Sequence, residues 1–303
     1  MIFVVTEIYN YEINMITKLL LFLKKHLPKL FFIRLRKVYY FFLNNIHPRI
    51  SENEFKKILT DKLGIKEGSV VFIHSSVDKM FLSFPFYNLL PILKDAVGPE
   101  GTLLFPCSHI KIRAEEFLKT PDAVFDVKRS VTIRGILPEM ARQEKNAYRS
   151  LHPTNSVVAI GKYAKELTQY HQDTIYPCGE KSPFYEITKY YGIIIGLGVS
   201  VDRLSFVHSV EDVMKEEFPL KTRNDKVYEC KVIDNERNTR LVKTLVAAQE
   251  INNRNVKRFI KANIPRDICK LINYKGVAFF RADSKKLFGK MVILAKEGKT
   301  IYS

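Results

Sequence analysis

The apolar run Gly192–Gly198 constrains the fold most, because it is too hydrophobic to be a surface strand. Its sequence, Gly-Ile-Ile-Ile-Gly-Leu-Gly, predicts a strand buried on both faces, which is typical of a sheet covered by helices on both sides. The glycines predict a sharp turn after the strand and a close approach of a ligand to the backbone. The chain then enters a predicted helix that either Asp202 or Ser205 caps.

That predicted helix carries ionisable side chains at one-turn spacing. A carboxylate at Glu211 can hold one nitrogen of the His208 imidazole and leave the other free to accept a proton near neutral pH. The alternative for an isolated His-x-x-Glu is a solvated helix face. The apolar face of the helix has Val207, Val210 and Met214, and the polar face has His208, Glu211, Asp212 and Lys215.

Short apolar runs alternate with amphipathic segments along most of the chain. This alternation predicts an α/β fold, a layered sheet with helices on both faces. Residues 111–129 are expected to be an irregular surface excursion, and no linker divides residues 51–303, which are predicted to form one domain. Expected strands are 68–73, 101–106, 157–161, 192–198, 228–233, 277–280 and 291–295, and expected helices are 52–63, 86–97, 132–145, 162–171, 241–262 and one that begins at Pro183 with Ser182 as its cap.

Polar side chains follow two of the predicted strands. His74, Ser75 and Ser76 come directly after the strand over 68–73, and Ser108 follows the strand over 101–106. Hydroxyls and backbone amides at the carboxyl ends of strands bind acyl carriers or phosphates. The sequence therefore predicts a binding site for such a group at this edge of the sheet.

The net charge of +17 is unevenly distributed. Residues 1–50 carry +6 and residues 241–303 carry +10, which leaves +1 for residues 51–240. Because the segment with the polar motifs is nearly neutral, we expect no nucleic-acid partner. Four scattered cysteines form no Cys-x-x-Cys pair, so neither a metal site nor a disulfide framework is expected. We expect the protein to lie in a reducing cytoplasm.

Residues 1–50 are predicted to be a basic, aromatic helical extension. No uncharged run in them approaches the ~20 apolar residues that span a bilayer. Helices of this composition bind anionic headgroups, which would place the protein peripherally at the inner membrane face. The alternative is helices that pack on the domain or in a homo-oligomer, with snorkelling lysines. Both alternatives stay open, as does the choice of Met1 or Met15 as the start.

Six short motifs stand in order along residues 52–222. They are Val71-Phe-Ile-His74-Ser75-Ser76, Val97-Gly98-Pro-Glu-Gly101-Thr102, Arg149-Ser150-Leu-His152-Pro153, Gly179-Glu-Lys-Ser182-Pro183, Gly196-Leu-Gly198 and Val207-His208-Ser-Val-Glu211. Together they resemble the aminoglycoside 3-N-acetyltransferase family, also called antibiotic N-acetyltransferases. The resemblance is loose after residue 222 and does not include residues 1–50.

The resemblance implies an α/β sandwich particular to this family and the transfer of acetyl from acetyl-CoA to an amine of a sugar-like acceptor. It implies that His208 is the general base, and we expect either Glu211 or Asp202 to orient it. No metal is expected. The expected coenzyme-binding residues are His74, Ser75, Ser76, Ser108 and Gly135.

Arg203 departs from the family pattern, in which Asp-Ser-Asn-Thr stands where this chain has Asp202-Arg203-Leu204-Ser205. A cation near the base disfavours polycationic acceptors and favours one with phosphate or carboxylate. We therefore predict an amino sugar destined for a cell-surface polysaccharide and carried on a nucleotide or lipid phosphate. The alternatives are an aminoglycoside, as in antibiotic resistance, and a non-catalytic module that binds nucleotide or glycan.

Three other reactive side chains are expected to be structural. His152 is predicted to fix a turn, and His171 to lie on an exposed helix end. Cys107 has no neighbour that would lower its pKa and make it nucleophilic.

Overall fold

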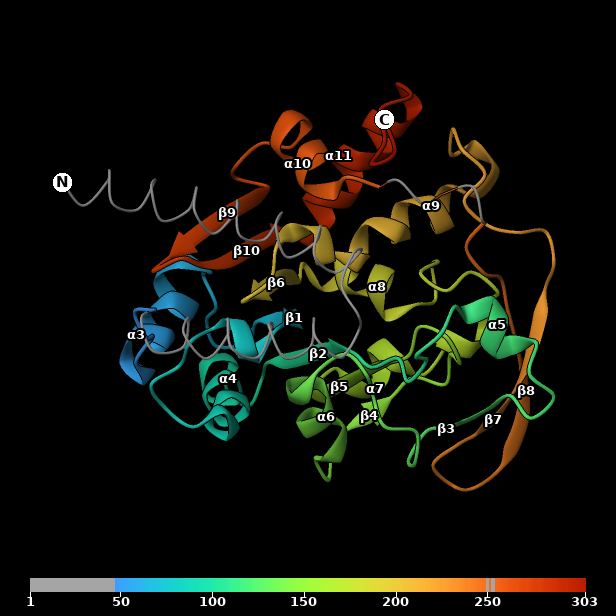
Figure 1. The fold of residues 1–303 in the computed structure, drawn as a ribbon, viewed down its shortest axis with the longest axis horizontal. Coiled ribbons are helices and arrows are strands. Elements are labelled where there is room, and N and C mark those ends of the chain that lie inside the picture. Colours follow the sequence, from blue (N-terminus) through green and yellow to red (C-terminus); the bar gives the residue numbers. More distant parts are fainter. Residues whose placement is uncertain (1–46, 249–250, 252–253) are drawn as a thin grey trace, which may run out of the picture.

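The computed structural model describes residues 47–248, 251 and 254–303 (Figure 1). Its centre is a seven-stranded sheet in the order β4-β5-β2-β1-β6-β10-β9, with helices on both faces, which confirms the predicted layered α/β fold. A basic extension with membrane contact was predicted for residues 1–50, of which residues 1–46 lie outside the described residues. In the described part of the chain, every helix is too short or too polar to cross a membrane.

The middle of the sheet is parallel. β1 (Val70–Ser75) pairs in parallel with both β2 (Thr102–Pro106) and β6 (Ile193–Leu197). The register places His74 opposite Gly196 on β6, so the carboxyl ends of these two strands lie side by side. The outer strands are antiparallel to their neighbours: β4 (Tyr148–Arg149), β5 (Val157–Gly161), β9 (Cys269–Tyr274) and β10 (Val277–Asp283).

Two groups of helices cover the two faces of the sheet. Successive side chains of a strand point to opposite faces, so Val71 and Ile73 pack with one group and Phe72 with the other. Ser182 caps its helix, and Pro183 occupies the first turn, as predicted. The first group is α3 (Glu52–Lys57), α4 (Leu89–Val97) and α6 (Ile136–Gln143), and the second is α7 (Ala164–Thr168), α8 (Pro183–Glu186), α9 (His208–Met214), α10 (Val256–Asn263) and α11 (Ser284–Lys296).

A separate three-stranded sheet lies beside the main one, at the right of Figure 1. It consists of β3 (Val124–Asp126), β7 (Tyr228–Ile233) and β8 (Thr239–Thr244). The prediction that residues 111–129 are irregular was wrong, because they contain α5 (Ala114–Leu118) as well as β3. The reason is a small core of their own, in which Phe125 and Val127 are buried against β7 and β8.

Two predicted elements near the end of the sequence were also wrong. Residues 241–262 are not one helix, since β8 continues to Thr244 and α10 begins only at Val256. Exposure alternates along β8, with Leu241 and Lys243 exposed and Val242 buried, which is the period of a strand. Residues 291–295 lie within α11 and not in a strand, because the apolar run is one part of a helix face that packs on the main core.

Candidate active site

Two glycines of β6 and its exit have different functions. Gly198 has a φ of +68°, and a Cβ there would lie 2.6 Å from the Ser76 carbonyl oxygen. It makes the sharp turn that the sequence predicted. A Cβ on Gly196 would lie 2.1 Å from the Phe280 ring. The structure therefore corrects the interpretation of Gly196, which admits a neighbouring side chain and not a ligand.

The entry into α9 differs from the prediction. Two 3₁₀ turns, η6 (Val201–Arg203) and η7 (Ser205–Val207), lead into α9, and no side chain caps its first residue. The predicted caps Asp202 and Ser205 were wrong. Asp202 instead caps α10, where its Oδ1 accepts a hydrogen bond of 2.9 Å from the Lys257 amide. Ser205 Oγ is buried and has no hydrogen-bond partner among the described residues.

Glu211, and not Asp202, holds the proposed base. The Nδ1 atom of His208 lies 3.0 Å from each carboxylate oxygen of Glu211. Glu211 is only 4% exposed, so this face of α9 is not solvated. Burial alone would raise the pKa of Glu211, but hydrogen bonding and charge from His208, Arg223 and Tyr302 hold it below its ordinary value. The carboxylate is therefore ionised and orients the imidazole.

A second buried carboxylate fixes the position of α9. Asp212 is fully buried, and Arg223 donates to its two oxygens with Nε and Nη2, each at 2.6 Å. The amide of Cys178 donates to Oδ2 at 2.7 Å. Burial lowers the pKa of Arg223, but the paired carboxylate outweighs it and raises the pKa above its ordinary value. This network ties α9 to two loops and fixes the direction of His208.

Arg254 contacts the other nitrogen of the base. Its Nη1 lies 2.5 Å from Nε2 of His208. A guanidinium is always protonated and has no acceptor, so it donates and Nε2 accepts. The Nδ1 atom then carries the hydrogen and donates it to Glu211. Both nitrogens of the proposed base are engaged.

The end of β1 presents unpaired polar atoms. His74 Nε2 and Ser75 Oγ are buried and have no hydrogen-bond partner among the described residues. Burial, together with the charge of Arg134, lowers the pKa of His74 to about 3, so its imidazole is neutral. Ser76 is already engaged, since its hydroxyl donates to Asp78 at 2.6 Å.

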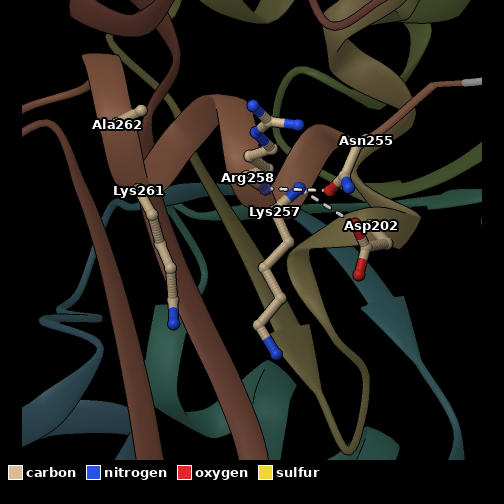
Figure 2. Close-up of a pocket in the computed structure, with 6 residues that line it drawn as sticks. All are labelled: Asp202, Asn255, Lys257, Arg258, Lys261 and Ala262. Carbon is tan, nitrogen blue, oxygen red and sulfur yellow. Dashed lines mark hydrogen bonds between the residues drawn. The ribbon is translucent and has the colours of Figure 1, made fainter.

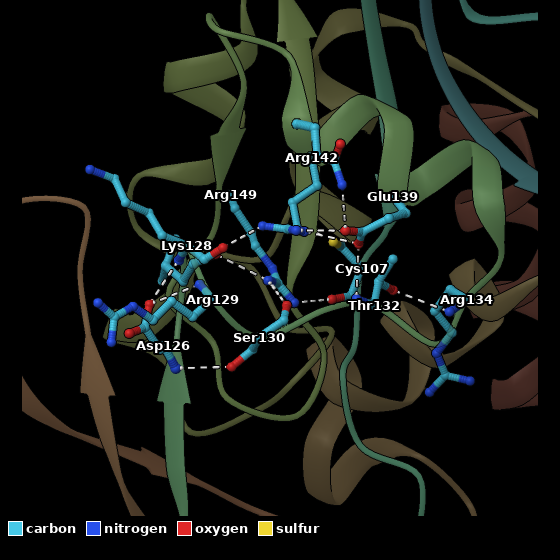
Figure 3. Close-up of polar contacts among 12 residues, drawn as sticks. Cys107, Asp126, Lys128, Arg129, Ser130, Thr132, Arg134, Glu139, Arg142 and Arg149 are labelled. Atoms are coloured by element: carbon cyan, nitrogen blue, oxygen red, sulfur yellow. Dashed lines mark hydrogen bonds and ion pairs between the residues drawn. The ribbon is translucent and has the colours of Figure 1, made fainter. Parts of the chain in front are cut away.

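The segment that leads into α6 brings the remaining predicted coenzyme residues together. The Ser108 carbonyl accepts hydrogen bonds from the Thr132 hydroxyl and the Ile133 amide, both at 3.0 Å. Gly135 has a φ of +112°, and a Cβ there would lie 3.9 Å from the Ser75 carbonyl. Residues 132–135 therefore bridge the ends of β1 and β2. Figure 3 shows Thr132 and Arg134 of this segment.

These groups fit an acyl thioester with an amide-rich arm. Buried hydroxyl and imidazole atoms that have no partner among the described residues lose most if no ligand binds, and Gly135, which precedes α6, lies beside the Ser75 carbonyl. The described residues contain no group of three or more His, Cys, Asp or Glu side chains placed to hold a metal ion.

A basic hollow of about 490 Å³ adjoins η6 and α10 (Figure 2). Figure 2 shows Lys257 and Lys261 reaching to the same side, with Arg258 directed to the other side of the helix. The one carboxylate that lines it, on Asp202, is engaged by the Lys257 amide. The hollow therefore favours anions.

The competing histidines and Cys107 have structural roles. His152 Nδ1 accepts from the Asn155 amide at 3.3 Å and fixes a turn, as predicted. His171 was expected at the surface but is fully buried, where it bonds Ser150 and the Pro177 carbonyl, each at 2.8 Å. Burial raises the pKa of Cys107, in agreement with an unreactive thiol.

Sequence reasoning missed three residues of the site. Arg223, Arg254 and Tyr302 reach α9 from segments far along the chain. The buried acids Glu211 and Asp212 were the available signal, because a buried charge needs a partner. That signal says a partner exists but not which residue it is.

Known proteins match both the sequence and the fold. The aminoglycoside 3-N-acetyltransferase family matches residues 72–277. Aminoglycoside N(3)-acetyltransferase IX of Micromonospora chalcea is 29% identical over 192 residues, which are 58% of this chain and 68% of that protein. Aminoglycoside N(3)-acetyltransferase III of Pseudomonas aeruginosa is 29% identical over 185 residues, 56% of this chain and 66% of that protein. The matched regions span about two thirds of these relatives.

Solved structures show the same fold. Aminoglycoside acetyltransferase AAC(3)-Xa superposes with a TM-score of 0.72 at 20% identity, covering 88% of this chain and 99% of that one. AAC-IIIb in its binary complex with CoASH gives a TM-score of 0.66 at 20% identity, covering 84% and 100%. The predicted antibiotic N-acetyltransferase-like fold is confirmed. Because the family match also extends over more than half of the sequence, the chain belongs to the aminoglycoside 3-N-acetyltransferase family.

Proposed function

We propose that this acetyl-CoA-dependent N-acetyltransferase transfers acetyl directly to an amino group of an aminoglycoside, with His208 as the general base. The observation that carries the proposal is the His208–Glu211 pair, in which a buried carboxylate holds Nδ1, so that Nε2, which Arg254 contacts in this structure, is the nitrogen that serves the acceptor. The catalytic assignments are His208 as base and Glu211 as the group that orients it. Asp202 takes no part in orienting the base, since its carboxylate caps α10.

The chemistry follows from the position of the imidazole. An ammonium group is unreactive until it loses a proton, and a positioned base contributes about 10²–10⁴-fold in rate. The neutral amine attacks the thioester carbonyl, a C–N bond forms, and Nε2 takes the proton that the nitrogen loses. The C–S bond then breaks, and the sulfur leaves with its electron pair and receives that proton from the imidazolium. The buried Glu211 carboxylate stabilises the imidazolium meanwhile.

The coenzyme is proposed to lie at the ends of β1 and β2. His74 and Ser75 supply the unpaired polar atoms, and Ser108 and Gly135 shape the bridge between the strands. Ser76 contributes backbone and not its hydroxyl, which Asp78 holds. Acetyl-CoA supplies the activated acyl group, and these residues position it.

The comparisons favour an aminoglycoside acceptor, because the similar curated proteins carry that name. Our first expectation, an amino sugar for a cell-surface polysaccharide, has no support among them. An amino sugar linked to a nucleotide or lipid phosphate stays as the second candidate on one observation. Arg254 contacts the base and Arg203 stands five residues before it in the sequence; both are exposed, and neither has a carboxylate partner among the described residues. A homo-oligomer, the absence of nucleic acid, a cytoplasmic location and peripheral membrane contact stay predictions.

An assay of thiol release from acetyl-CoA tests the proposal across two panels, aminoglycosides and nucleotide-linked amino sugars. Turnover of an aminoglycoside with none for the linked sugars supports the first candidate, and the reverse supports the second. Calorimetry with acetyl-CoA covers the remaining alternative. If the coenzyme does not bind and no amine is acetylated, the chain is a non-catalytic module on this fold.

A further inference from the structure

Arg254 covers the nitrogen that the proposed reaction needs. Its Nη1 donates to Nε2 of His208 over 2.5 Å, while Glu211 holds Nδ1. A neutral imidazole has one acceptor nitrogen, so Nε2 cannot serve Arg254 and take a proton from an amine at the same time. The acceptor must therefore replace the guanidinium before acetyl transfer.

Only the side chain of Arg254 has to move to uncover the base. The backbone beside it is fixed, because the Asn255 amide donates to the Ile301 carbonyl at 2.8 Å and the Asn255 side chain caps α10. The guanidinium is exposed, and within the described chain its one hydrogen bond is the bond to His208. A rotation of the side chain thus uncovers Nε2 with the loss of a single hydrogen bond.

The group on Arg254 and the amine of the acceptor are alike. A guanidinium and an ammonium are both cations that donate hydrogen bonds and accept none. Glu211, on the far side of the imidazole ring, is a buried carboxylate, and the exchange keeps one cation opposite it. An ammonium of an aminoglycoside can therefore replace Arg254 with no net change of charge beside His208.

We propose that Arg254 is an intramolecular competitor of the acceptor, which covers His208 in the free enzyme and is displaced by an amine of the aminoglycoside as it binds. The inference rests on the proposed function and adds a residue that sets how strongly the acceptor binds. A ligand that binds only the uncovered fraction of the molecules has an apparent affinity reduced by that fraction. Arg254 thus raises the KM for the acceptor, and it leaves kcat unchanged because the bound complex no longer contains the contact.

The kinetics of Arg254→Gln with an aminoglycoside, at saturating acetyl-CoA, test the competition. The glutamine is shorter and uncharged, so it leaves Nε2 open. We expect the KM for the acceptor to fall about 3–10-fold, the range of one hydrogen bond, and kcat to stay within about twofold of the wild type. Arg254→Ala should give the same result. The control is Arg266→Gln, which removes an exposed arginine that forms no hydrogen bond with His208 in the described part of the chain and should keep the wild-type KM.

Chemical labelling of His208 tests the covered state without any acceptor. Diethyl pyrocarbonate acylates a neutral imidazole through its free nitrogen lone pair, and peptide mass spectrometry measures the rate at His208 alone. We expect this rate to be about 3–10-fold higher in Arg254→Gln than in the wild type, and unchanged in Arg266→Gln. The reagent carries no charge, so a higher rate reports an uncovered nitrogen and not a weaker repulsion of cations.

Equal labelling of His208 in the wild type and Arg254→Gln overturns the inference, and so does an unchanged KM for the acceptor. A fall in kcat of about tenfold or more, in a variant that unfolds at the wild-type temperature, also overturns it, because Arg254 would then assist the reaction. If the wild type acetylates no aminoglycoside, the proposed function fails, while the labelling rates still decide whether Arg254 covers His208.

Discussion

The hydroxyl of Tyr302 donates to Oε1 of Glu211 over 3.0 Å, from 91 residues away in the sequence. The segment after α11 thereby reaches the carboxylate that orients His208. The preceding carbonyl, on Ile301, accepts from the Asn255 amide at 2.8 Å. Ile301 and Tyr302 thus connect Glu211, the partner of His208, with Asn255, the neighbour of Arg254.

Tyr302→Phe should lower kcat about tenfold and leave the KM for acetyl-CoA nearly unchanged. The hydroxyl stabilises the ionised Glu211, so its removal makes the His208–Glu211 pair bind a proton more tightly. The acid limb of the kcat profile should therefore move to higher pH, by about one unit or less. A purely structural role for the hydroxyl would not move that limb.

The control is Tyr228→Phe, which removes a comparable bond of 2.9 Å to Glu115 on the smaller sheet. It should leave both kcat and the pH profile unchanged. If Tyr302→Phe keeps the wild-type kcat and profile, the hydroxyl does not act on the base.

Asp212→Asn should lower the free energy of unfolding by about 3–5 kcal/mol, because it leaves Arg223, whose side chain is only 14% exposed, without its charged partner. Asp225→Asn breaks an exposed pair with Lys221 and should change stability by less than about 1 kcal/mol. Urea unfolding of both variants provides the comparison. Similar small losses in the two would show that the buried pair does not anchor α9.

Stability should fall between pH 6.5 and 4.5 because of buried histidines. Burial lowers the pKa of His171 to about 4 and that of His74 to about 3, so the folded state binds fewer protons than the unfolded state below pH 6.5. Each fully buried histidine contributes about 2 kcal/mol to this loss by pH 4.5. The pKa of Glu139 is about 2, because Arg142 holds its charged form, so that carboxylate still stabilises the fold in this window.

The measurement is the free energy of unfolding at several values of pH from 7.5 to 4.5. A flat profile would mean that these histidines are not held neutral in the folded protein.

Ser75→Leu should raise the KM for acetyl-CoA at least tenfold, because the leucine fills the space beside the buried Ser75 hydroxyl, which has no partner in the described part of the chain. The preference among acceptors should not change. Acceptor preference is measured as kcat/KM for several acceptors at a fixed concentration of acetyl-CoA. A changed acceptor preference with an unchanged KM for acetyl-CoA would show that the two substrate sites had been exchanged.

Local sequence patterns predicted much of the fold and of the candidate site. The parallel centre of the sheet was predictable because β1, β2 and β6 are short buried apolar runs, and the His208–Glu211 pair because both residues lie one turn apart on a single helix. The polar ends of β1 and β2 followed from the same runs.

The predictions that were wrong concern features that depend on contacts between distant segments. The run at 291–295 is apolar in the same way as a strand, and only its packing in α11 against the main core decides that it is helical. Arg254 lies 46 residues from His208, and no periodicity links the two. The role of Asp202 was predicted wrongly for a similar reason. Its partner is the Lys257 amide at the start of α10, and the sequence predicted that helix to begin earlier, at residue 241.

The kinetics of His208→Ala test the central claim most directly. Turnover with the best acceptor and the dissociation constant for acetyl-CoA are measured on the same preparation. We expect kcat to fall by about 10²–10⁴-fold, because the proton acceptor is gone, while coenzyme affinity stays within about threefold of the wild type. A variant that retains wild-type turnover, or that loses turnover and coenzyme binding equally, would contradict the assignment of His208 as the base.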